Sequence, residues 1–368
     1  MSSEELSNEG SRQATALAGQ RILVTGGAGF IGCALSHLLA PRVAAYLALD
    51  NLHPQVHPRS VRPARLHPAA ELLIGDVTDP RALERALATP PDVVIHLAAE
   101  TGTGQSLTEA SRHGSVNVVG TTQLTDALGR QKITPKLVVL SSSRAVYGEG
   151  AWRRADGSLH YPGLRTREQL EAGRWDFEGS WQPASATLTH PAPTSVYGAT
   201  KLAQEHILRA WCASMKVPLS VFRFQNVYGP GQSLTNSYTG IVALFCRMAL
   251  RGEAIPLYED GRITRDFVFI DDVVSAVAAA VEQRRPGLHT WDVGSGAITT
   301  VEGLAREIAV LYGAPAPAIC GRFRDGDVRH AGCEIAATQA ELGWSPSFNL
   351  GRGLQSLRAW IDRELQAS

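Results

Sequence analysis

A tyrosine and a lysine lie four residues apart in the sequence Tyr197-Gly-Ala-Thr-Lys201. On a helix, residues at this spacing share one face, so the two side chains can reach the same site. A phenol with a pKa near ~10 is a poor base at neutral pH, and a nearby ammonium group favours the phenolate and lowers that pKa. The pair can therefore transfer protons. The same spacing also arises by chance in surface pairs, so its meaning depends on the residues around it.

Hydroxyl groups precede this pair in the chain. An apolar run over residues 136–140 ends in Ser141, Ser142 and Ser143, where a hydroxyl could hydrogen-bond a reacting oxygen. These hydroxyls could act together with Tyr197 and Lys201 on a hydroxyl-bearing substrate.

A glycine-rich turn follows the first apolar run, residues 22–25. Glycines permit a tight turn and a close approach of the backbone to a pyrophosphate, which the following helix N-terminus favours electrostatically. Asp50 ends the next predicted strand, 18 residues beyond Gly32. A carboxylate there can bind both ribose hydroxyls and would repel a 2′-phosphate, so NAD is predicted over NADP. The residues assigned to the turn and helix start are Gly26, Gly29, Phe30, Ile31 and Gly32.

Two further strand ends support a dinucleotide site. Asp76 and Val77 follow the third predicted strand, where Asp76 could accept from an adenine amino group or serve as a turn or cap residue. Leu97, Ala98 and Ala99 close the fourth predicted strand, with small side chains where a dinucleotide would pass.

Short apolar runs alternate with amphipathic stretches, which predicts a parallel sheet covered by helices on both faces. The predicted strands are 22–25, 45–49, 71–74, 93–97, 136–140 and 219–224, and helices include 31–40 and 80–88. We predict a disordered leader over residues 1–20, a doubly wound α/β Rossmann-type domain over 21–227, and a smaller substrate-binding lobe over 228–368. The chain can return from that lobe to the first domain. Residues 150–193 interrupt the first domain as an insertion of open role.

Composition sets limits on the partners. The chain has 35 basic and 35 acidic residues, which gives no general affinity for nucleic acid or anionic membrane. Five scattered cysteines indicate reduced thiols of a cytoplasmic protein, and no apolar run is long enough to span a bilayer. His53 and His57 could bind a metal or be solvated loop residues. Without further ligand spacing, no metal site is predicted.

Taken together, these motifs resemble the NAD-dependent nucleotide-sugar epimerase/dehydratase group of the extended short-chain dehydrogenases/reductases. The resemblance covers residues 21 to about 344. It rests on T-G-G-A-G-F-I-G at 25–32, D-V at 76–77, L-A-A at 97–99, N-V-V-G-T at 117–121, S-S-S-R-A-V-Y-G at 141–148, Y-G-A-T-K at 197–201, R-D-F-V-F-I-D-D-V at 265–273 and R-D-G-D at 324–327. It implies bound NAD, a lobe for the nucleotide sugar, and a homodimer through a four-helix contact that includes the Tyr197 helix.

The resemblance also implies roles for single residues. Tyr197 would be the base, Lys201 its partner and a ligand of the NAD ribose, and Ser143 the third member of a catalytic triad. Asn51 and Asn117 would contact the cofactor. The residues implied for the sugar nucleotide are Asn226, Arg265 and Arg324, with the arginines near its diphosphate. Each arginine alone is more often a solvated surface charge. Arg144 could touch the substrate or pair with an acid of the insertion.

The reaction depends on the residues after Ser143. Family dehydratases carry an Asp-Glu pair there, whereas this chain has Arg144 and Ala145, which disfavours dehydration. Epimerisation at C4 through a 4-keto sugar needs no further acid or base. Segments 50–57, 99–106 and 229–240 and the insertion resemble the bacterial dTDP-L-rhamnose 4-epimerases, which make dTDP-6-deoxy-L-talose for surface polysaccharides or glycosylated metabolites. A UDP-sugar 4-epimerase, a 4-ketoreductase or dehydrogenase, and a non-catalytic NAD sensor stay open as alternatives.

Overall fold

A parallel sheet forms the centre of the computed structural model, which describes residues 17–57, 59–233 and 240–367. Within these ranges the sheet has seven strands in the order β13-β9-β5-β4-β1-β2-β3. The strands are β1 (Arg21–Thr25), β2 (Ala45–Asp50), β3 (Ala70–Ile74), β4 (Val93–His96), β5 (Leu137–Ser143), β9 (Leu219–Phe224) and β13 (Leu288–Val293). The predicted Rossmann-type α/β fold is confirmed.

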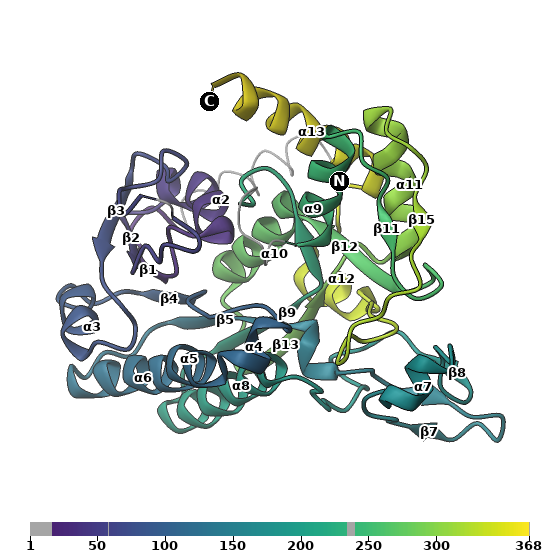
Figure 1. The fold of residues 1–368 in the computed structure, drawn as a ribbon. Coiled ribbons are helices and arrows are strands. Elements are labelled where there is room, and N and C mark those ends of the chain that lie inside the picture. Colours follow the sequence, from purple (N-terminus) through teal and green to yellow (C-terminus); the bar gives the residue numbers. More distant parts are fainter. Residues whose placement is uncertain (1–16, 58, 234–239, 368) are drawn as a thin grey trace, which may run out of the picture.

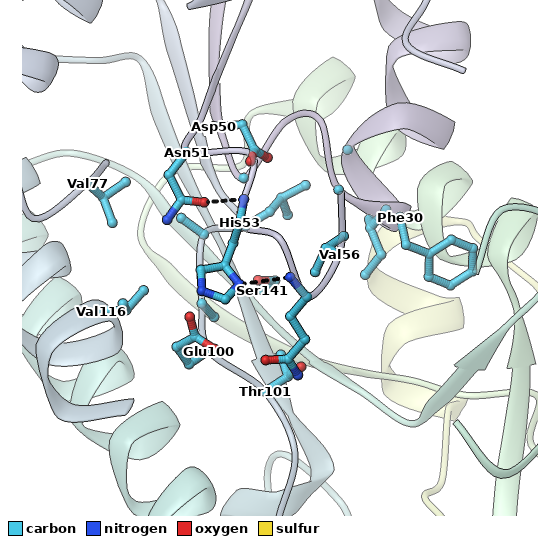
Figure 2. Close-up of a pocket in the computed structure, with 18 of the residues that line it drawn as sticks. Phe30, Asp50, Asn51, His53, Val56, Val77, Glu100, Thr101, Val116 and Ser141 are labelled. Atoms are coloured by element: carbon cyan, nitrogen blue, oxygen red, sulfur yellow. Dashed lines mark hydrogen bonds between the residues drawn. The ribbon is translucent and has the colours of Figure 1, made fainter. Parts of the chain in front are cut away.

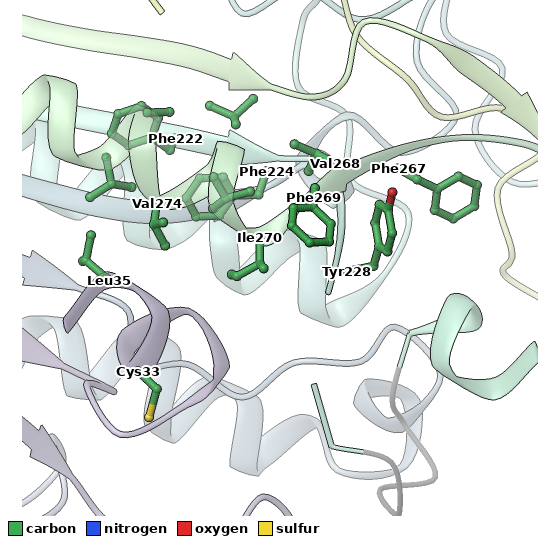
Figure 3. Packing of buried hydrophobic residues seen from close by; sticks show 14 of the residues in the cluster. Cys33, Leu35, Phe222, Phe224, Tyr228, Phe267, Val268, Phe269, Ile270 and Val274 are labelled. Atoms are coloured by element: carbon green, nitrogen blue, oxygen red, sulfur yellow. The ribbon is translucent and has the colours of Figure 1, made fainter. Parts of the chain in front are cut away.

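Both faces of the sheet are buried. Successive residues of each strand point to opposite sides, so one strand contributes to a cluster on each face. Ile22 and Val24 of β1 pack in one hydrophobic cluster, and Leu23 packs in the other. Helices α2 (Phe30–Leu39) and α10 (Ile270–Gln283) cover the first face, whereas α3 (Pro80–Ala86), α6 (Gly120–Arg130) and α8 (Val196–Met215) lie along the other (Figure 1). Figure 3 shows Phe222, Phe224, Ile270 and Val274 packed together on the first face.

The order of the strands creates the binding crevice. From β1 the chain runs outward through β2 and β3, and it then crosses back to β4 on the other side of β1. The loops after β1 and β4 therefore separate at the carboxyl ends of the strands, which is where doubly wound sheets bind ligands. Short helical segments follow β4: α4 (Gln105–Thr108), α5 (Ala110–His113) and a π-helical turn, η2 (Gly114–Val119).

A smaller lobe is built mainly from segments that follow β9 in the chain. It contains a sheet of β10 (Asn226–Tyr228), β12 (Thr264–Phe269) and β14 (Ile298–Thr300), together with a pair formed by β11 (Pro256–Leu257) and β15 (Ala318–Ile319). Its helices are α9 (Ile241–Leu250), α11 (Val301–Tyr312), α12 (Ala336–Leu342) and α13 (Leu350–Ala367). Strand β13 and helix α10 belong to the central sheet layer, so the chain returns to that layer after residue 228.

Residues 150–193 contain three short strands, β6 (Trp152–Arg153), β7 (Leu159–His160) and β8 (Ser180–Trp181), and helix α7 (Arg167–Glu171). Figure 1 shows them at the edge of the molecule, below the C-terminal lobe. The buried Arg165 binds Glu259 at 2.8 Å and donates from Nη2 to the carbonyl oxygen of Asp327, also at 2.8 Å. The segment is therefore docked on the lobe by a buried ion pair.

The predicted disordered leader requires a correction at its end. Leu17 is fully buried in the core cluster, and its carbonyl oxygen accepts a hydrogen bond from the Gln20 amide. Residues 17–20 are thus part of the folded domain, because burial of an apolar side chain stabilises the order of the chain around it. The remainder of the predicted leader, 1–16, lies outside the described residues, as does 234–239 within the segment 229–240.

Candidate active site

The loop between β1 and α2 is built so that only glycine fits at its tightest points. Gly26 has a φ of +67°, and a Cβ there would lie 2.7 Å from the amide nitrogen of Ala98. A Cβ on Gly32 would lie 2.5 Å from the carbonyl oxygen of Gly27. Gly29 is the N-cap of α2 and makes no side-chain cap, so the first amides of the helix remain available to an anion. The backbone thus forms a cradle for phosphate groups.

Asp50 stands at the end of β2 beside this cradle. Its carboxylate accepts hydrogen bonds from the amides of Ala28, at 3.0 Å, and Leu52, at 2.9 Å. These two bonds fix the carboxylate toward the cavity and leave further lone pairs for ribose hydroxyls. Asn51 donates to Asp76 at 2.8 Å, which joins two of the predicted adenosine-side residues.

The opposite wall comes from β4 and the segment after it. Leu97, Ala98 and Ala99 line the cavity as predicted, but Asn117 does not. Asn117 is fully buried behind the wall, where it exchanges hydrogen bonds with the backbone of Glu100 and donates to Thr200 Oγ1 at 3.0 Å. Asn117 therefore links the cavity wall to α8 and helps to position both.

These walls enclose a cavity of about 390 Å³. Figure 2 shows Asp50 and Asn51 along one edge and Glu100 and Thr101 along the opposite edge, with His53 between them. The glycine cradle, the uncapped helix start and the acid at the ribose position together fit an NAD molecule. The lining includes the predicted cofactor residues Gly26, Gly29, Phe30, Ile31, Gly32, Asp50, Asn51, Asp76, Val77, Leu97, Ala98 and Ala99.

Ser143, Tyr197 and Lys201 all line the same cavity. Ser143 is the last residue of β5, and the other two lie one turn apart on α8. Ser195 caps this helix by accepting from the Gly198 amide at 3.0 Å. A Cβ on Gly198 would lie 2.4 Å from the Ala145 carbonyl oxygen, so the helix start is pressed against the turn that follows Ser143. Close packing thus sets the distance between the serine and the tyrosine.

Burial controls the protonation of these groups. It raises the pKa of Tyr197, and a hydrogen bond with Ser143 and the positive charge of Arg144 act against that rise. Burial also lowers the pKa of Lys201 to about 7, while the charge of Glu205 acts in the opposite direction. The sequence predicted that the Lys201 ammonium would lower the Tyr197 pKa, whereas in the structure the opposing groups are Ser143 and Arg144. The Lys201 side chain is 2% exposed and donates to Gln204 Oε1 at 2.8 Å.

Of the residues predicted for the sugar nucleotide, three lie near the triad or the small cavity beside it and one lies on the surface. Arg144 lies next to Ser143, and its Nε donates to Asn226 Oδ1 at 3.1 Å. Among the ion pairs of the described residues, none joins Arg144 to an acid of the insertion, which was one of the two alternatives for Arg144. Arg265 is buried and binds Asp327 at 2.8 Å, and Asp327 and Arg144 line the same small cavity. Arg324 is exposed, with its guanidinium 4.9 Å above the Tyr258 ring, and lines neither cavity.

Sequence reasoning missed several residues of the site. Gln204, the partner of Lys201, could have been suspected because it follows the lysine by three residues on the same helix. Asp327 belongs to the R-D-G-D motif, but no role was assigned to it. Gln55 and Arg112 line the cavity and carry no local sequence signal.

Metal and membrane signals are also absent from the part of the chain that the structure describes. In residues 17–57, 59–233 and 240–367, no group of three or more His, Cys, Asp and Glu side chains lies close enough to hold a metal ion. In the same ranges, no helix has the length and apolarity needed to cross a bilayer.

The geometry of the site indicates an NAD-binding enzyme, and comparison with known proteins gives the same class. The NAD dependent epimerase/dehydratase family matches residues 22–294, and the chain belongs to this family. A dTDP-L-rhamnose 4-epimerase of Burkholderia thailandensis is 59% identical over 349 residues, which cover 94% of this chain and 96% of the relative.

Solved structures extend the likeness to the fold. A UDP-glucose 4-epimerase from Thermotoga maritima, crystallised with UDP-glucose, has a TM-score of 0.76 and 28% identity over 94% of this chain and 99% of its own. A Thermus thermophilus UDP-glucose 4-epimerase in complex with NAD has a TM-score of 0.73 and 26% identity over 93% and 99%. The predictions of an enzyme, of NAD as cofactor and of a nucleotide-sugar 4-epimerase are confirmed.

Proposed function

We propose that this enzyme inverts C4 of dTDP-L-rhamnose and so interconverts it with dTDP-6-deoxy-L-talose. The observation that carries the proposal is the 59% identity to a dTDP-L-rhamnose 4-epimerase, which extends over 94% of the chain. A UDP-sugar 4-epimerase and a 4-ketoreductase or dehydrogenase are the alternatives within the same fold. A product of this kind would supply glycosyl transfer to surface polysaccharides.

In the proposed mechanism Tyr197 removes the proton from the C4 hydroxyl, and Ser143 hydrogen-bonds the same oxygen. NAD, when bound, supplies the hydride acceptor. Ser143 and Arg144 favour the phenolate of Tyr197 against its burial, which supports its use as the base. Lys201 would bind the cofactor ribose, and Gln204 holds its Nζ in place at 2.8 Å. The same phenol returns the proton after the 4-keto sugar has rotated and the hydride has returned to its other face, so no further acid or base is needed.

The residues beside Ser143 support epimerisation over dehydration. Elimination of water across C5 and C6 requires an acid and a base near those carbons. The turn after Ser143 supplies Arg144, a cation whose pKa burial lowers only to about 10, and Ala145, which has no proton to give. Neither side chain can serve as the acid–base pair at neutral pH.

Contacts to the sugar nucleotide are proposed for Arg144, Asn226 and Arg265. Arg144 and Asn226 are joined by a hydrogen bond and lie beside the triad, which supports a place near the sugar. Arg265 would reach the diphosphate by exchanging the single contact of its Nη2 with the Asp327 carboxylate for contacts with phosphate oxygens, to which a guanidinium can donate two parallel hydrogen bonds. Arg324 is proposed for the diphosphate on the family resemblance, and it would have to leave the Tyr258 ring.

Assembly and location also belong to the proposal. A homodimer would form through helices that include α8, and the exposed Leu107 and Val119 near that helix supply apolar surface. A cytoplasmic location is supported by the five cysteines, all of them free thiols, because disulfides form in oxidising compartments.

The test is a panel of dTDP- and UDP-sugars followed by NMR without added cofactor. Inversion at C4 of dTDP-L-rhamnose by wild type, and its loss in Tyr197→Phe with NAD binding retained, is the expected result. Turnover that requires one added reduced cofactor per product would favour the ketoreductase. Faster inversion of a UDP-sugar than of dTDP-L-rhamnose would replace the proposed substrate.

A further inference from the structure

The cavity is bridged by polar contacts between two loops. The sheet order places β2 and β4 on either side of β1, so the loops that follow them flank the glycine cradle. Residues 51–57 follow β2, and residues 97–113 follow β4 and include α4 and α5. The two loops meet across the groove that the cradle opens into.

Two glutamines make the central contact. Gln55 Nε2 donates to Gln105 Oε1 at 2.9 Å, and Gln105 Nε2 donates back to Gln55 Oε1 at 3.1 Å. This reciprocal amide pair joins residues that are 50 positions apart in the sequence. Gln105 is buried and Gln55 is half-buried, so water competes only partly for these bonds.

Arg112 strengthens the bridge. One of its terminal nitrogens, Nη2, donates to Gln55 Oε1 at 3.2 Å and binds Glu100 Oε2 at 2.8 Å. The other, Nη1, binds Glu109 Oε2 at 2.8 Å. Two carboxylates therefore hold the guanidinium in the orientation that reaches Gln55. Gln105 also donates to Glu109, at 3.0 Å, which links both sets of contacts.

Gln55, Glu100 and Arg112 line the same cavity as the glycine cradle and Asp50. We propose that Gln55, Gln105 and Arg112 form a clasp across the groove and hold the cofactor in place between turnovers. A dinucleotide beneath this clasp would leave only after the contacts between the loops had broken, so each contact adds to the barrier for release. The inference rests on the groove being the NAD site.

Retention of the cofactor suits the chemistry proposed above. An epimerase restores its cofactor in every turnover and has no need to exchange it. Loss of the cofactor after oxidation would strand a ketone in the site. A clasp built from side chains can therefore close the groove tightly, because it does not have to open once per cycle.

The test measures NAD dissociation without any sugar, so it is independent of the substrate assignment. Enzyme loaded with isotope-labelled NAD is chased with unlabelled NAD, and the label that remains after gel filtration is followed over time. Gln55→Ala should raise the dissociation rate by about tenfold or more, the change expected when one or two net hydrogen bonds are lost. Gln105→Ala should act in the same direction.

The matched control is Gln131→Ala, which removes a glutamine whose side chain donates to the Glu84 carbonyl oxygen on the outside of the domain. Its dissociation rate should equal that of wild type. Combining Gln55→Ala with Arg112→Gln should give less than the product of the two single effects, because both break the same contact. A folded Gln55→Ala enzyme that releases NAD at the wild-type rate would overturn the clasp.

Discussion

The charge of Glu205 should be essential for the stability of the main domain. Glu205 and Arg223 form an ion pair at 2.7 Å, with side chains that are 2% and 5% exposed. The same carboxylate also accepts from Arg223 Nε at 3.0 Å and from the Ser142 hydroxyl at 2.5 Å. Glu205→Gln keeps the shape of the side chain. Its amide NH₂ is a donor, however, so it cannot accept from the N–H and O–H groups that face it. The Arg223 guanidinium also stays buried without its counter-charge. Such a loss should lower the free energy of unfolding by about 3–5 kcal/mol.

Urea denaturation of the NAD-loaded enzyme, followed by fluorescence, measures this loss. The control is Glu171→Gln, which breaks an ion pair at 2.9 Å between side chains that are 56% and 65% exposed. It should cost at most about 1 kcal/mol, because water already solvates both charges. Equal losses in the two variants, both below that value, would show that burial does not strengthen the Glu205–Arg223 pair.

Three further predictions concern pH and the cofactor. Burial lowers the pKa of His96 from 6.5 to about 3, so between these pH values only the unfolded chain binds the proton and stability falls as the pH falls. In His96→Gln, the loss of unfolding free energy between pH 7 and pH 5 should be smaller than in wild type by up to about 2 kcal/mol, and an equal loss would contradict the buried neutral imidazole. Gly32→Ala should remove copurifying NAD, because its Cβ would lie 2.5 Å from the Gly27 carbonyl oxygen, whereas Gly129→Ala, with nothing within 4 Å, should retain it. Asp50→Ala should weaken NAD binding more than sugar-nucleotide binding and reduce discrimination against NADP, as measured by calorimetry. Unchanged NAD affinity would place the ribose elsewhere.

Local spacing and periodicity determined most of the fold. The predicted strand 219–224 coincides with β9, and the predicted start at residue 45 coincides with that of β2. Strand β5 was predicted to end at residue 140, but it continues through Ser143 because its serines pair with β9. Apolar runs mark the buried part of a strand, whereas polar residues that continue a ladder leave no such mark.

The glycine cradle and the triad were readable for the same reason. Gly26 and Gly32 are required by contacts within a short stretch of chain, and Tyr197 and Lys201 share a helix face through their spacing. Requirements of this kind depend on residues that are close together in the sequence. The sequence alone therefore specified the cofactor and the class of chemistry, and it predicted the residues that we propose for proton transfer.

Only the tertiary structure decided which charges meet and how deeply each is buried. The pairing of Arg265 with Asp327 and the bonding of Gln55 to Gln105 join residues that are distant in the chain. The pKa of Tyr197 is likewise set by burial and by Arg144 and not by the lysine four residues away. Ion pairing and pKa depend on distance and on exclusion of water, and a linear sequence fixes neither until the chain has folded.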